Sequence, residues 1–62
     1  MTAQEAIATL NTMTPNGDRE VQHIIADEIL RAFSKSSSDE ETRAVAAAYE
    51  AAEKRVGGFW MS

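Results

Sequence analysis

Three side chains between residues 18 and 34 have the types and the spacing to form a polar site. His23, Asp27 and Arg31 follow one another at intervals of four residues, and on a helix this spacing places them in one row along a single face. An imidazole can donate to an anionic or heterocyclic ligand near neutral pH, and a guanidinium binds anions through a fork of donors. We therefore take His23, Asp27 and Arg31 as a candidate ligand-binding site. We include Trp60, in the C-terminal tail, as a further candidate ligand-binding residue.

The same row has two other interpretations. In the first, Asp27 orients His23 and pairs with Arg31, and the row only fixes the border of a helix. In the second, His23 and Asp27 bind a metal ion, but they leave the site short of ligands unless Glu28 or symmetry-related copies complete it. Because any helix brings residues i and i+4 together, the spacing alone does not choose among the three.

The sequence gives little support for nucleophilic catalysis, for a pair of catalytic carboxylates or for a phosphate-binding loop. It has no cysteine, and no serine has His23 as an evident base. Asp27 and Glu28 are adjacent, so on a helix they point about 100° apart and cannot act as a pair. Gly57 and Gly58 follow a helical pattern and not a strand, which indicates a helix stop and not a phosphate loop. We therefore expect a non-enzymatic protein with no cofactor and no bound metal.

A helix from about residue 18 to 34 must position the candidate site. Asp18 is placed to cap it, as a carboxylate at the positive end of the helix dipole. Its apolar side chains cover roughly half of the cylinder at about 100° per residue, which is wider than the stripe that a contact with one helix needs. They are Val21, Ile24, Ile25, Ala26, Ile29, Leu30, Ala32 and Phe33. We expect this helix to pack on two neighbours, one of which comes from another chain.

Two further helices flank the central one. Thr2 and Glu5 form a capping-box pattern that opens a short helix over about residues 2–11, and Ser38 with Glu41 opens a last helix over about residues 39–56. A connector containing Pro15 and Asn16-Gly17 separates the first two helices. In the last helix, Val45, Tyr49, Ala52 and Val56 form an apolar seam. The pattern predicts a single all-α domain of three helices over residues 1–62, dominated by an antiparallel helical hairpin.

Length and charge restrict the partners. A chain of 62 residues without cysteine buries a small core and has no disulfide to support it, so we expect a homo-oligomer. The net charge of −4 argues against nucleic acids and anionic membranes as partners. We see neither a run of about 20 apolar residues nor a signal peptide, and we expect a cytoplasmic protein.

The tail, residues 57–62, ends in three large apolar side chains, Phe59, Trp60 and Met61. Such side chains are disfavoured in solvent when they lie together. We expect them to fold back onto the central helix, because a small core gains from aromatic area. The alternative is that they anchor another chain.

The chain resembles a group of very small phage and prophage proteins. In those proteins a helix carrying H-x-x-A-D is followed by a second helix that ends in an aromatic cluster of F-W-Y-A type. The match covers about residues 16–62, through Asp18, Glu20, His23, Ala26, Asp27, Leu30, Ala48, Phe59 and Trp60. The chain departs from the pattern at Met61-Ser62, where tyrosine and alanine are usual, and at KSSSDEE, where a glycine-containing turn is usual. The resemblance implies a phage or prophage source and leaves the chemistry open.

Three functions are compatible with these observations. The first is a phage-type binding protein, with a counter-defence role, that sequesters a small anionic, nucleotide-like ligand at a subunit interface. The second is an inhibitor or adaptor that binds a host protein through its apolar arc or its aromatic tail. The third is a metal-assisted hydrolase whose site is completed by symmetry from His23, Asp27 and Glu28.

Overall fold

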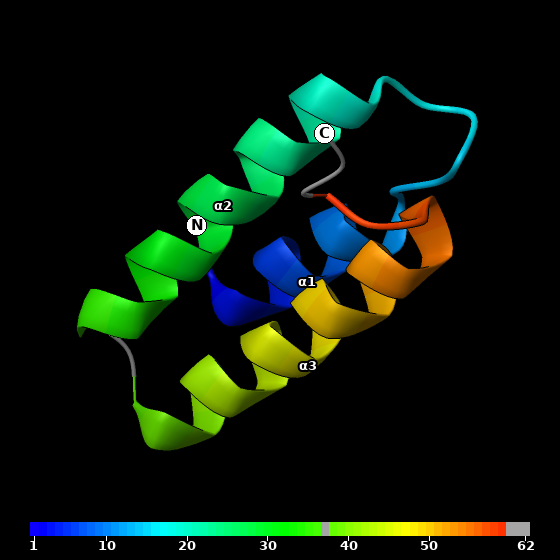
Figure 1. The fold of residues 1–62 in the computed structure, drawn as a ribbon. Coiled ribbons are helices and arrows are strands. Elements are labelled where there is room, and N and C mark those ends of the chain that lie inside the picture. The colour runs from blue at the N-terminus through cyan, green and yellow to red at the C-terminus, as the bar shows by residue number, and fades with distance from the viewer. Residues whose placement is uncertain (37, 60–62) are drawn as a thin grey trace.

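A computed structural model describes residues 1–36 and 38–59 and contains three helices: α1 (Ala3–Asn11), α2 (Arg19–Ser36) and α3 (Asp39–Val56). Figure 1 shows α2 and α3 running in opposite directions as a hairpin, with α1 alongside α3. The described residues contain no strand, so the predicted all-α class with three helices is confirmed. Helix α2 continues to Ser36, two residues beyond the expected end, and Lys35 in its last turn suits the negative end of the helix dipole.

The first helix begins at the capping box that the sequence predicts. The Thr2 hydroxyl accepts from the Glu5 backbone N–H at 3.1 Å, and the Glu5 carboxylate accepts from the Thr2 backbone N–H at 2.8 Å. These hydrogen bonds from Thr2 hold the pKa of the exposed Glu5 carboxyl below its usual value, because they favour its charged form. Two otherwise unpaired groups at the start of α1 are thereby satisfied.

The hairpin helices are also capped by side chains or glycine. Asp18 accepts from the Val21 N–H at 3.1 Å at the start of α2, and Ser38 accepts from the Glu41 N–H at 3.3 Å at the start of α3. Helix α3 ends at Gly57, whose φ of 96° lies in the left-handed region that glycine adopts without strain. This end turns the chain back towards α2.

The core lies between the three helices and includes one side chain from the connector and one from the tail. Its buried members are Ala6, Leu10, Met13, Ala26, Ile29, Phe33, Val45, Tyr49, Ala52, Val56 and Phe59. The predicted seam of α3 is entirely buried. The turn residues of the connector do not predict the burial of Met13.

Arg55 joins the end of α3 to the end of α1. Its guanidinium donates to the carbonyl oxygens of Met13 and Leu10 at 2.9 and 2.8 Å. These two carbonyls lie at the C-terminal end of α1 and just beyond it, where helical partners run out. The side chain of Gln22 likewise holds the connector, since its amide both accepts from and donates to the backbone of Thr14.

The apolar arc of α2 is only partly covered. Ala26, Ile29 and Phe33 are buried, and α2 packs mainly on α3, with a shorter contact to α1. Val21, Ile24 and Ile25 remain 50%, 54% and 37% exposed. Among the described residues, half of the arc is therefore exposed.

None of the described helices combines the length and the apolar character needed to cross a membrane.

Candidate functional site

Three of the four predicted site residues lie in a row along one side of α2, and Trp60 lies outside the described residues. The side chains of His23 and Asp27 are mostly covered, with 21% and 26% of their surface exposed, whereas Arg31 is exposed. The row is at the border of the buried face, on the side opposite to Ile25. The helix thus presents its polar row where α2 meets the end of α3 and the tail.

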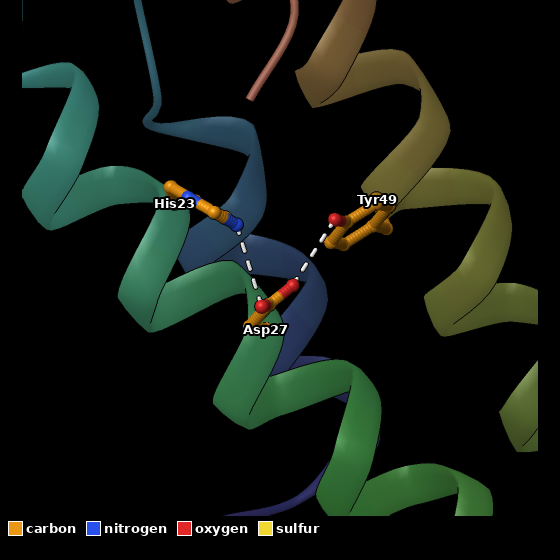
Figure 2. A network of polar contacts seen from close by, with 3 residues as sticks. All are labelled: His23, Asp27 and Tyr49. Atoms are coloured by element: carbon orange, nitrogen blue, oxygen red, sulfur yellow. Dashed lines mark hydrogen bonds and ion pairs between the residues drawn. The ribbon is translucent and has the colours of Figure 1, made fainter. Parts of the chain in front are cut away.

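Asp27 is the centre of a short polar chain that joins α2 to α3. Its Oδ2 lies 3.3 Å from His23 Nε2, and its Oδ1 accepts a hydrogen bond of 3.2 Å from the Tyr49 hydroxyl. Figure 2 shows the Asp27 carboxylate between the imidazole and the phenol, with His23 and Asp27 on α2 and Tyr49 on α3. The carboxylate therefore orients His23 and ties the two helices of the hairpin together.

Besides His23, the polar partner of Asp27 is Tyr49, whereas the sequence predicts Arg31. Asp27 and Arg31 both belong to the described residues, and they form no ion pair with one another. Tyr49 was predicted only as a member of the apolar seam, since the sequence places it 22 residues from Asp27. A buried tyrosine usually pairs its hydroxyl with a polar group, and this was the one signal in the sequence that pointed to a polar partner.

Phe59 closes the other side of the histidine. Its ring stacks on His23 with centroids 6.1 Å apart and planes 10° apart, and it meets the Tyr49 ring at 5.4 Å in a tilted arrangement. The expectation that the tail folds back onto the central helix is confirmed for Phe59, which is 2% exposed. The corresponding expectation for Trp60 and Met61 falls outside the described residues.

These contacts make His23 a positioned side chain with limited access. One of its ring faces lies against Phe59, and Nε2 is buried beside Asp27. Within the described residues no serine or threonine is hydrogen-bonded to the imidazole. The cluster therefore fixes the hairpin and Phe59 of the tail, and the row continues from it along α2 to the Arg31 side.

A groove lies on that side. It has a volume of about 380 Å³ and is lined by Asp27, Leu30, Arg31 and Ser34. The Ser34 hydroxyl donates to the Arg31 backbone carbonyl at 3.0 Å, as is common for serine within a helix. The groove thus combines a carboxylate, a guanidinium, a hydroxyl and an apolar floor, and two of the four predicted site residues line it.

A second groove of similar volume, about 380 Å³, lies on the other side of α2. Its floor is apolar, from Ile29, Ala32 and Phe33, and Met1, Glu28 and Glu41 stand at its edges. It adjoins the exposed part of the apolar arc. No sequence pattern pointed to this groove, because it forms where the starts of α1 and α3 approach α2.

In the described part of the chain, no three histidine or acidic side chains lie close enough together to hold a metal ion. His23 and Asp27 make a pair, and Glu28 projects from the opposite border of the buried face, towards the second groove. A metal site on these residues would need ligands from another copy.

Comparison of the chain with protein-family models, with curated proteins and with solved structures gave no match.

Proposed function

We propose that this chain is a non-enzymatic binding protein that acts as a homo-oligomer and holds a small anionic, nucleotide-like ligand beside α2. The observation that carries the proposal is the groove lined by Asp27, Leu30, Arg31 and Ser34. Its volume of about 380 Å³ lies at the lower end of the range of small-molecule sites, about 300–1,000 Å³. The Arg31 guanidinium suits a phosphate, while the apolar floor suits a heterocyclic base.

Among the described residues, the lining of the groove comes from α2, whereas ligand sites normally enclose most of their ligand. A neighbouring chain on the exposed side of α2 would enclose the ligand further. The resemblance of residues 16–62 to small phage and prophage proteins supports a phage source. In a phage protein, sequestering the ligand would serve a counter-defence role.

The exposed part of the apolar arc favours a second candidate function. Val21, Ile24 and Ile25 lie on one face of α2 at spacings of three and four residues, as do the anchors of helices that dock in a groove of another protein. In this alternative the chain is an inhibitor or adaptor of a host protein. The two functions differ in whether a small ligand stabilises the isolated protein.

Thermal unfolding with added probes tests the proposal. ATP, cyclic AMP and cyclic di-GMP serve as nucleotide probes, and Zn²⁺ tests the metal-assisted alternative. A probe at about 100 times its Kd adds about 2.7 kcal/mol, which for a domain of this size raises Tm by roughly 10 °C or more. We expect one nucleotide to give such a rise.

Substitution of the groove arginine identifies the site. Arg31→Ala should abolish the rise in Tm, and Arg43→Ala, which removes another exposed arginine, from α3, should leave it intact. His23→Ala is a weaker test because it also removes the contact with Phe59. A nucleotide effect that survives Arg31→Ala contradicts the site, and no effect from any nucleotide favours the host-protein alternative.

A further inference from the structure

We propose that two copies of the chain pack antiparallel through the outer face of α2, defined by Val21, Ile24, Ile25 and Glu28, with Glu20 of each copy paired with Arg31 of the other. This inference deepens the proposed function, since it names the surface through which the oligomer forms. It is carried by the exposure of three large side chains and by the placement of two charges at their border.

Three of the four residues of the outer face are exposed although they are of a buried type. Val21, Ile24 and Ile25 are 50%, 54% and 37% exposed, and Met1, at the edge of the adjoining groove, is 73% exposed. Each large aliphatic side chain stabilises an association when it becomes fully buried in it. A standard interface takes about 800 Å² from each partner, about a fifth of the 4219 Å² surface of this chain. Met1 and the edge of the second groove add to the surface of the outer face and bring it closer to the area of a standard interface.

Glu20 and Arg31 determine the direction of the partner. They lie eleven residues apart, which is about three helical turns, so they stand on one border of the outer face about 20° apart around the axis. Both are exposed. A parallel two-fold partner would carry this border to the opposite side of the interface, so that Glu20 and Arg31 of the two chains would not meet. An antiparallel partner with its two-fold axis midway between them, beside Ile25, places Glu20 against Arg31 twice.

Two further interactions favour the antiparallel arrangement. Antiparallel helices oppose their dipoles favourably, and Ile24 and Ile25 of the two chains meet near the axis, where side chains are most completely buried. Exposed ion pairs contribute little to affinity, so the apolar contacts hold the two chains together and the charges select their direction. An anionic ligand in the Arg31 groove can then replace Glu20 on Arg31 without separating the chains.

Because the chain has no cysteine, a single introduced thiol reports the interface directly. Two cysteines form a disulfide when their Cα atoms come within about 4.4–6.8 Å. Ile25→Cys, beside the proposed axis, should give a disulfide-linked pair under mild oxidation. Ala47→Cys, on the exposed side of α3, is the matched control and should stay a single chain. Equal cross-linking of the two variants would overturn the inference.

Charge reversal tests the direction. Glu20→Arg and Arg31→Glu should each raise the dissociation constant of the pair about tenfold, and the double variant should restore it to within about threefold, as measured by sedimentation. A double variant as weak as either single one, or single variants that associate like the unaltered chain, would overturn the antiparallel arrangement.

Both measurements are made without ligand, so they are independent of the nucleotide test. A cross-linked pair in a protein that no nucleotide stabilises would support this interface and contradict the ligand function. An oligomer that does not cross-link at residue 25 would contradict this interface alone.

Discussion

Helices α2 and α3 are equally long, at 18 residues each, and they pack on one another, yet their outer faces differ. All three large apolar side chains of α3, those of Val45, Tyr49 and Val56, are buried. Its exposed positions carry alanine and charged residues. Helix α2 buries Ile29 and Phe33 but exposes three β-branched side chains.

Among the described residues, α3 therefore buries all of its large apolar side chains, whereas α2 leaves part of its apolar arc exposed. Alanine, glutamate and lysine on an exposed helical face favour the helix and contact nothing. Valine and isoleucine favour a helix less and gain stability only by packing. Their presence on the exposed side of α2 is explained if that side is covered by another chain.

The largest expected effect comes from a charge on the inner face of α3. Val45 is 0% exposed, and an unpaired carboxylate at such a position costs about 3–5 kcal/mol. A 62-residue chain has a total stability of about 3–9 kcal/mol at the usual value per residue. Val45→Glu should therefore lose most of its helical circular dichroism at 37 °C, whereas Ala44→Glu, at the neighbouring exposed position, should remain helical. If both variants are equally helical, Val45 is not in the core.

A charge on the outer face of α2 should act on association and leave folding intact. Ile24→Glu removes the most exposed of the three aliphatic side chains from both copies, and we expect roughly a hundredfold weaker association from the lost burial of about 1.5–3 kcal/mol per side chain. Light scattering should then report single chains, with an unchanged circular dichroism spectrum. Ala51→Glu, on the exposed side of α3, should keep the mass of the unaltered protein. If Ile24→Glu keeps the mass of the unaltered protein, the outer face of α2 contributes no more to association than the outer face of α3.

The smallest expected effect concerns the inner border of the hairpin, where the two helices are joined by a polar contact. Tyr49→Phe removes the hydroxyl that donates to Asp27 at 3.2 Å and should lower the free energy of unfolding by about 1–2 kcal/mol in urea. Association should not change, since this contact lies away from the outer face of α2. A urea midpoint equal to that of the unaltered chain would show that the hydrogen bond contributes nothing to the hairpin.

The sequence predicts the local features of this fold well. The caps at Thr2, Asp18 and Ser38 and the stop at Gly57 are local, because each involves groups within four residues of one another. Helical periodicity likewise predicts the seam of α3, since its apolar residues form a single narrow row.

Contacts between distant residues were not predictable in the same way. The partner of Asp27 is 22 residues away, and the carbonyls bound by Arg55 are 42 and 45 residues away. A pattern on one helix gives the width of its apolar arc, but the placement of the other helices decides which part of the arc is covered. The candidate site was therefore predicted as a row on α2, without Tyr49 and without the stacking of Phe59 on His23.

Sedimentation equilibrium of the unaltered chain over a range of micromolar concentrations tests the central claim most directly. The outer face of α2 predicts a mass of twice the 6.8 kDa chain, which falls towards one chain on dilution. A mass of 6.8 kDa at every concentration, for a protein with full helical content, would contradict it.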